Sequence, residues 1–221
     1  MVEDRYENYL TISGEGAFQF LKDCEGNMAS YKQKDGTYNL ILQSRFTFNA
    51  LVPVPQEVLD VGYSSRQISP SLSLEDPFYD KLIKVPGSGE EWQQNNWGSS
   101  MDVEEDSVYP RTEHWDTVFG GPEISEVAVE FSTEDTPPRQ WVINCAKRYP
   151  DLEFKLSYIN DVSSCAGKLV IANGEVVSDI TYLKESSNFN AFIEEEFGVS
   201  VSSISEEGSI IGANPDYGAV E

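Results

Sequence analysis

The sequence predicts an α+β fold, and this prediction rests on residues 127–182, where strand, helix and turn signals follow one another without a gap. Apolar and polar side chains alternate over residues 127–131, which is the period of a half-buried strand. Two prolines then open a helix whose apolar residues, from Trp141 to Tyr149, share one face. Alternation resumes over residues 152–158, and Asn173-Gly174 is the two-residue turn expected between two further strands. We therefore expect a strand, a helix capped by Thr136, and a three-stranded meander.

The rest of the chain carries weaker signals for secondary structure. A period-two run over residues 45–51 predicts a strand with Phe46, Phe48 and Ala50 on one face. Prolines and serines over residues 62–80 indicate an irregular connection. The other expected elements are a strand at residues 9–13, helices at 17–24, 56–61, 90–97 and 189–197, the last capped by Ser186 or Ser187, and a candidate strand at 112–120.

The motifs of catalytic and cofactor sites are absent from the sequence. Gly14-Glu15-Gly16 lacks the lysine and hydroxyl residue of a phosphate loop, so it indicates a structural turn. His114 is the sole histidine and has no second ligand at metal-binding spacing. Trp92 and Trp97 lie five residues apart, which favours core or interface aromatics over a binding cage. We therefore expect no enzyme activity and no cofactor, with a metal-dependent hydrolase as the alternative through chelation by residues 104–106.

The N-terminal sequence and the cysteines predict a cytoplasmic protein. The first ten residues are charged and lack the apolar core of a signal peptide, and no apolar run approaches the ~20 residues that span a bilayer. Cys24, Cys145 and Cys165 are odd in number and widely spaced, which favours reduced thiols.

Charge is the most unusual property of the composition. The chain has 38 Asp and Glu against 15 Lys and Arg, a formal net charge of −23. The excess falls in two blocks, residues 101–135 and 175–221, while residues 136–174 hold more bases than acids. Direct binding to a phosphate backbone needs clustered Lys and Arg, so we expect no nucleic-acid binding. A basic partner surface fits this charge, although an acidic surface also serves solubility alone.

Several short, separated sequence segments resemble those of one known family. They are Phe46 to Pro55, Asn96 to Ser99, Val129 to Pro138, Tyr149-Pro150 before Phe154 to Tyr158, and Ala166-Gly167 before Asn173 to Glu175. Their order is similar to that of the Api92-like, YubB-type proteins of phages and plasmids. Ser100 and Met101 depart from that pattern, which usually has lysine and tryptophan before the aspartate here at Asp102.

The resemblance implies a ferredoxin-like domain, an antiparallel sheet with helices packed on one face, in a protein of a mobile genetic element inside the host cell. This domain would span residues 1–183 with a long insertion near 62–125, followed by an acidic C-terminal extension at 184–221 with a short helix. The resemblance supplies no catalytic residues.

We expect the protein to bind and inhibit a host nucleic-acid-handling or defence complex, of restriction or CRISPR type, through carboxylates that mimic phosphates. The alternative is an interaction scaffold that binds through exposed aromatic residues, with the charge serving solubility. Salt distinguishes the two, because phosphate mimicry weakens with ionic strength and apolar docking does not. The candidate partner-binding residues are Asp102, Glu104, Glu105, Asp106, Glu113, Asp116, Glu123, Glu126, Glu134, Asp135, Glu194, Glu195 and Glu196.

Overall fold

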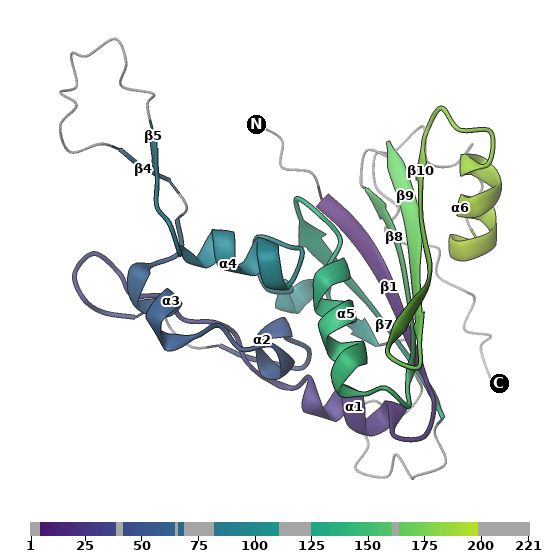
Figure 1. The fold of residues 1–221 in the computed structure, drawn as a ribbon, viewed down its shortest axis with the longest axis horizontal. Coiled ribbons are helices and arrows are strands. Elements are labelled where there is room, and N and C mark those ends of the chain that lie inside the picture. Colours follow the sequence, from purple (N-terminus) through teal and green to yellow (C-terminus); the bar gives the residue numbers. More distant parts are fainter. Residues whose placement is uncertain are drawn as a thin grey trace, which may run out of the picture.

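A computed structural model describes residues 5–38, 42–64, 66–68, 82–110, 125–160 and 164–198 of the chain. A six-stranded antiparallel sheet with the order β10-β9-β8-β1-β7-β6 organises these residues (Figure 1). Helices accompany the sheet, so the predicted α+β class is confirmed. The strands are β1 (Arg5–Ser13), β6 (Tyr109–Pro110), β7 (Glu126–Glu134), β8 (Glu153–Asn160), β9 (Cys165–Ala172) and β10 (Glu175–Leu183).

The connectivity within this sheet is that of a ferredoxin-like domain. Along the chain the order is β1, α1 (Ala17–Asp23), β6, β7, α5 (Arg139–Arg148) and β8. In the sheet these strands interleave as β8-β1-β7-β6, which is the split βαβ arrangement. The hairpin of β9 and β10 extends the sheet beyond β8. Its turn has positive φ at both Asn173 (54°) and Gly174 (74°), as the predicted two-residue hairpin requires.

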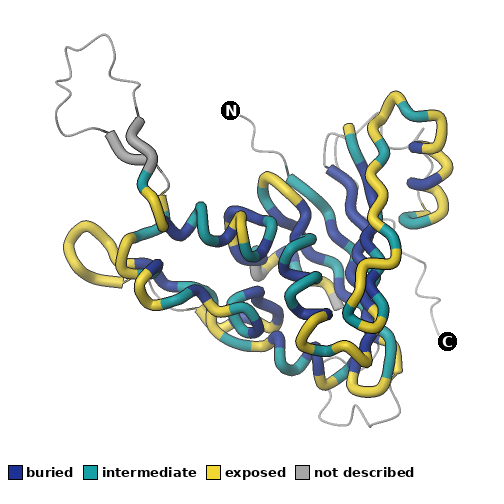
Figure 2. Tube along the Cα trace, in the orientation of Figure 1, coloured by how far each residue is buried: buried dark blue, intermediate teal, exposed yellow. Residues whose placement is uncertain are grey.

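The two faces of the sheet carry different helices (Figure 1). Helices α1 and α5 cover one face, which we call the inner face, and α6 (Phe189–Phe197) packs against the other, the outer face. The main core lies on the inner face, where Phe131, Trp141 and Leu156 are buried. Figure 2 shows long buried stretches along the strands of the sheet. A second, smaller core joins α6 to the outer face through Ile159, Ala166, Phe189, Phe192 and Ile193.

The chain between α1 and β6, residues 24–108, forms an insertion that shares the main core. Its helices are α2 (Phe48–Leu51), α3 (Gln56–Val61), α4 (Gly89–Asn96) and the short 3₁₀ helix η1 (Glu105–Ser107). Its small antiparallel pairs are β2 (Gly26–Asn27) with β3 (Gln43–Ser44), and β4 (Arg66–Ile68) with β5 (Leu82–Lys84). The domain boundaries expected at 62–125 and 183 stay predictions.

The predicted strand over residues 45–51 is wrong. Thr47 caps α2 instead, accepting the Asn49 N–H at 3.2 Å, and the Asp102 carboxylate accepts the Phe48 N–H at 2.7 Å. Phe46 and Phe48 are both buried, and both rings contact Trp141. The alternation was therefore a true burial signal, but a carboxylate from residue 102 bends the backbone into a helix.

One indole N–H group braces the insertion internally, and another connects it to α5. The Trp97 Nε1–H donates to the Val52 carbonyl at 2.9 Å, and the Trp141 Nε1–H donates to the Phe48 carbonyl at 3.1 Å. Trp97 is completely buried, and Trp92 packs edge-on against it. The prediction that Trp97 belongs to the core is confirmed.

Two of the predicted helix caps are wrong. The Thr136 hydroxyl donates to the Gly98 carbonyl rather than capping α5, whose N-cap is Pro138. Asn188 occupies the N-cap of α6 without a side-chain bond, so neither Ser186 nor Ser187 caps that helix. Gly198 ends α6 with φ 65°, as predicted. The candidate strand at 112–120, with His114 and Trp115, lies outside the described residues.

Candidate functional site

The strands β1, β7 and β8 bring a group of glutamates to the outer face of the sheet. Because Val127, Val129 and Phe131 point into the core, the alternate positions of β7 point away from it. Ser13 pairs with Glu126 on one side and Glu153 on the other, and its hydroxyl donates to Glu126 at 3.1 Å. We call the group formed by Glu7, Glu126, Glu130, Glu134 and Glu153 the outer acidic face.

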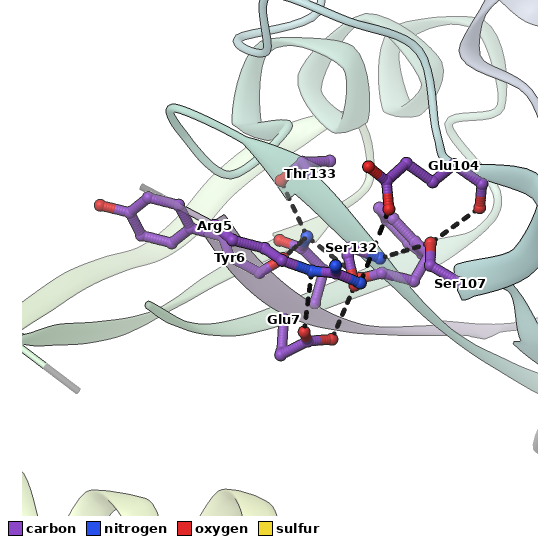
Figure 3. Close-up of polar contacts among 9 residues, drawn as sticks. Arg5, Tyr6, Glu7, Glu104, Ser107, Ser132 and Thr133 are labelled. Carbon is purple, nitrogen blue, oxygen red and sulfur yellow. Dashed lines mark hydrogen bonds and ion pairs between the residues drawn. The ribbon is translucent and has the colours of Figure 1, made fainter. Parts of the chain in front are cut away.

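Arg5 partly neutralises one end of this face (Figure 3). Its guanidinium lies 3.3 Å from Glu7 and 3.6 Å from Glu104, and it donates to the Ser132 hydroxyl at 2.8 Å. The Ser132 hydroxyl donates to Glu7 at 2.9 Å, and the Ser132 N–H donates to the hydroxyl oxygen of Ser107 in η1. The Arg5, Glu7 and Glu104 side chains are between 33% and 40% exposed, so these ion pairs remain in contact with water. Glu104 is therefore held next to the outer acidic face.

Asp102 is internal and does not form part of an exposed surface. It is 7% exposed, and it accepts hydrogen bonds from the Thr47 hydroxyl, the Phe48 N–H and the Val103 N–H. Burial raises its pKa, and these hydrogen bonds offset only part of that effect. The expectation that Asp102 contacts a partner conflicts with this burial, because its carboxylate is already used to shape α2.

Glu196 is also withdrawn from the surface. Its carboxylate is 3% exposed and lies 2.6 Å from both the Lys155 and Lys168 Nζ atoms, and the Ser157 hydroxyl donates to it at 2.9 Å. It fastens α6 to the outer face rather than facing a partner, which corrects its predicted role. Its neighbours Glu194 and Glu195 are exposed.

The other predicted residues divide into two groups. Asp106 and Asp135 are exposed, and the Ser100 hydroxyl donates to Asp135 at 2.5 Å. Glu113, Asp116 and Glu123 lie outside the described residues, as does the side chain of Glu105. The structure thus joins Glu126 and Glu134 on one face with Glu104 beside them, and it adds Glu7, Glu130 and Glu153, which the sequence did not identify. Strand register, which pairs residues far apart in the sequence, was the missing information.

A separate cavity of about 590 Å³ lies in the insertion. The loop of residues 28–34, the end of α3, α4 and residues 101–102 line it. Gln93 of α4 is 2% exposed, and Tyr31 is 6% exposed. Neither the Gln93 Oε1 nor the Tyr31 hydroxyl has a hydrogen-bond partner. Such buried unpaired groups are uncommon, since an unmade hydrogen bond costs stability.

Sequence reasoning missed this cavity because its walls come from four distant segments without a motif. Burial raises the pKa of the Tyr63 phenol, which lines the cavity, to about 12, and it raises the pKa of Tyr31 further. Both phenols therefore stay protonated at neutral pH and act as neutral hydrogen-bonding groups. The one local signal is Gly89, where an added Cβ would lie 2.2 Å from the Tyr31 ring.

Within the described part of the chain, no cluster of three His, Cys, Asp or Glu side chains could hold a metal ion. Cys24 and Cys145 are buried free thiols, and burial raises the pKa of both. Cys165 is half-buried, with its sulfur 3.4 Å from the Tyr6 hydroxyl. None of the helices in the described ranges has both the length and the apolar character needed to cross a membrane.

Residues 113–200 match the family model described as "Ferredoxin-like domain in Api92-like protein". Among solved structures, the chain is similar to the crystal structure of a protein api92 from Yersinia pseudotuberculosis, at 13% sequence identity and a TM-score of 0.40. That similarity covers 63% of this chain and 40% of the other, so the chain spans less than half of its relative's length. No curated protein matches the chain.

Proposed function

Starting from a chain whose residues 113–200 match the ferredoxin-like domain of Api92-like proteins, we propose that it acts by binding rather than by catalysis. Its outer acidic face would occupy the basic surface of a nucleic-acid-handling protein in the host cytoplasm. The carboxylates would stand where phosphates otherwise bind, and the complex would then be inhibited. A restriction or CRISPR-type defence complex of the host is the kind of partner that the charge fits.

The observation that supports this proposal is the strand register of the glutamates. Glu126, Glu130 and Glu134 occupy every fourth position of β7, with the same orientation. At about 3.3 Å per residue these positions are roughly 13 Å apart. Four steps from phosphate to phosphate along one DNA strand advance by a similar distance, at about 3.4 Å of helix axis each. The sheet therefore holds its carboxylates at intervals compatible with a phosphate backbone.

A rigid support is the second requirement for mimicry, because like charges repel one another. Here the support is β7, which hydrogen-bonds to β1 along its whole length and to β6 at residues 109–110. The opposite side of β7 is anchored by Val127, Val129 and Phe131 in the main core. Binding would consequently need little ordering of the glutamates, which keeps its entropic cost low.

The alternative of an aromatic interaction scaffold is less well supported. Trp97 and Trp141 are completely buried, and their indole N–H groups already have acceptors within the chain. Neither residue is available to a partner without unfolding.

The proposal is tested by charge-neutral substitution of the outer acidic face. In the variant Glu126→Gln, Glu130→Gln, Glu153→Gln, the carboxylates are replaced by isosteric amides. We expect the wild-type chain, used as bait in a host lysate, to retain a basic nucleic-acid-binding protein. Added duplex DNA should compete for that protein and release it from the bait. Retention should fall at least tenfold between about 50 and 200 mM salt, and the triple variant should lose it at low salt.

A matched variant controls for net charge alone. Glu25→Gln, Glu57→Gln, Glu185→Gln removes the same charge from exposed positions on the insertion and the loop before α6. This control should retain the partner. Equal retention by both triple variants, or retention that duplex DNA cannot compete with, would refute phosphate mimicry by this face.

A further inference from the structure

We propose that the cavity in the insertion is a binding site for a nucleoside monophosphate or a molecule of the same build, a planar heterocycle that carries a phosphate. The cavity is lined by Tyr31, Lys32, Lys34, Tyr63, Gln93 and Met101, among others. Its volume of about 590 Å³ lies within the ~300–1,000 Å³ range of small-molecule sites. This site shares no residue with the outer acidic face, so the two proposals stand or fall separately.

Two residues that line the cavity carry hydrogen-bonding atoms that the protein does not use. The Gln93 Oε1 and the Tyr31 hydroxyl are sealed from bulk water and have no partner. A side-chain amide provides both an acceptor and donors, and a phenol can donate or accept. A ligand edge with a donor next to an acceptor would satisfy both residues once these two closed-off atoms turn toward the cavity. Nucleobases carry such edges, and glutamine pairs with them in this way in protein complexes with nucleic acids.

The walls of the cavity suit a flat, polarisable ring. Tyr31 and Tyr63 meet edge to face, with ring centroids 5.6 Å apart. Met101, which is 38% exposed, and Met28 add two thioethers to the lining. Aromatic faces and thioethers both pack favourably on heteroaromatic rings. Gly89 allows this arrangement, because any side chain there would collide with the Tyr31 ring.

Two lysines give the mouth of the cavity a preference for anions. Lys32 and Lys34 are exposed on the loop that borders it, in a chain of net charge −23. The acids of the same lining are Asp60 and Asp102. Asp60 accepts hydrogen bonds from Tyr38 and Gln56, and Asp102 is occupied by Thr47, Phe48 and Val103. Lys32 also interacts electrostatically with Asp60, and Lys32 and Lys34 together would attract a phosphate on the bound ring.

The test is ligand-observed saturation-transfer NMR on the full chain, followed by calorimetric titration. The probes are AMP, GMP, CMP and UMP, with adenosine as the ligand lacking a phosphate and ribose 5-phosphate as the ligand lacking a base. At least one monophosphate should show saturation transfer at about 5 mM and bind with a millimolar or lower Kd. The nucleoside should bind more weakly, and ribose 5-phosphate more weakly still.

Three variants assign the contacts. Gln93→Leu and Tyr31→Phe should each weaken the monophosphate roughly tenfold by removing one hydrogen bond. Lys32→Gln with Lys34→Gln should weaken the monophosphate and leave adenosine unchanged. Gln94→Leu, on the exposed side of the same helix, is the matched control and should bind like the wild type.

Thermal unfolding separates loss of binding from loss of fold. Because Gln93→Leu removes a buried amide oxygen that has no partner, its melting temperature should equal or exceed that of the wild type. The proposal is overturned if none of the four monophosphates shows saturation transfer. It is equally overturned if folded Gln93→Leu binds as tightly as the wild type, or if ribose 5-phosphate binds as tightly as the monophosphates.

Discussion

Among the described residues, Glu196 on the sheet and Asp102 in the insertion are carboxylates with almost completely buried side chains, and the two are stabilised in opposite ways. Glu196, on the outer face of the sheet, accepts from two lysines and a serine. Asp102, in the insertion, accepts only from a neutral hydroxyl and two backbone N–H groups. Burial would raise the pKa of Glu196, but the hydrogen bonds from Lys155, Lys168 and Ser157 outweigh it and lower that pKa. Burial raises the pKa of Asp102 because no cation opposes it.

This difference shows what an excess of acidic residues can and cannot indicate. Both carboxylates come from the blocks of high acidic density, yet one fixes a backbone bend and the other docks a helix. Glu126, whose neighbour Val127 enters the core, stays exposed on its strand, and Glu130 on the same side is half-buried. The location of a carboxylate relative to the core, rather than the local charge count, decides whether a partner can reach it.

The largest effect is expected from removing the carboxylate in the insertion. Asp102→Ala should lower the free energy of unfolding by about 3 kcal/mol, because three buried donors lose their acceptor. Urea denaturation followed by tryptophan fluorescence measures this, since the Trp141 indole bonds to the Phe48 carbonyl of α2. Asp102→Asn keeps the size and one acceptor, so it should cost less. Equal stability of Asp102→Ala and the wild type would contradict a structural role.

A smaller effect should follow from filling the space next to Tyr31. Gly89→Ala places a Cβ 2.2 Å from that ring and should cost about 2 kcal/mol through displacement of the ring. Gly26→Ala is the matched control, because its Cβ would meet Ala50 at an ordinary 3.4 Å. It should change stability by less than about 0.5 kcal/mol. Urea denaturation measures both variants. If Gly89→Ala were as stable as the wild type, Tyr31 would not be tightly packed against Gly89.

The two regions also differ in how far their sequences predicted their structures. In residues 126–198 the signals were local: alternation in β7 and β8, Asn173-Gly174 in the hairpin, and the apolar face of α5. Each element there takes the conformation that its own residues favour. In the insertion, Phe46 and Phe48 alternate like a strand, but Asp102 and Thr47 fix a helix. That conflict involves a residue some 50 positions away and could not be seen from local periodicity.

The candidate sites show the same contrast between what local sequence predicts and what only distant contacts determine. The sequence identified Glu126 and Glu134 as surface acids but not Glu7 or Glu153, since these become neighbours only through strand register. The cavity combines Tyr31, Tyr63 and Gln93 through tertiary packing. Its only local sign was the glycine at position 89.

On the sheet side, the expected effect is smaller and local. Glu196→Gln should weaken the docking of α6 by about 1 kcal/mol, because Lys155 and Lys168 stay partly exposed and water compensates for part of the loss. Hydrogen exchange of the α6 amides should accelerate while that of β7 stays unchanged, since α6 packs on its own small core. Glu195→Gln, one residue away and exposed, serves as the control. Equal protection of α6 in both variants would mean that the apolar contacts alone hold the helix.

The pH dependence of stability should have opposite signs in the two regions. The folded pKa of Asp102 is raised, so its contribution is full below the unfolded pKa of about 3.9 and is lost as pH rises through the folded pKa. The folded pKa of Glu196 is lowered, so its contribution is present above the unfolded pKa of about 4.3 and is lost as pH falls through the folded pKa. Chemical denaturation of the wild type, Asp102→Asn and Glu196→Gln from about pH 3 to 7 isolates each difference. The stability advantage of the wild type over Asp102→Asn should shrink as pH rises, and its advantage over Glu196→Gln should shrink as pH falls. If both stability differences instead changed in the same direction with pH, that result would contradict the idea that the lysines near Glu196, and the lack of cations near Asp102, set the two pKa values apart.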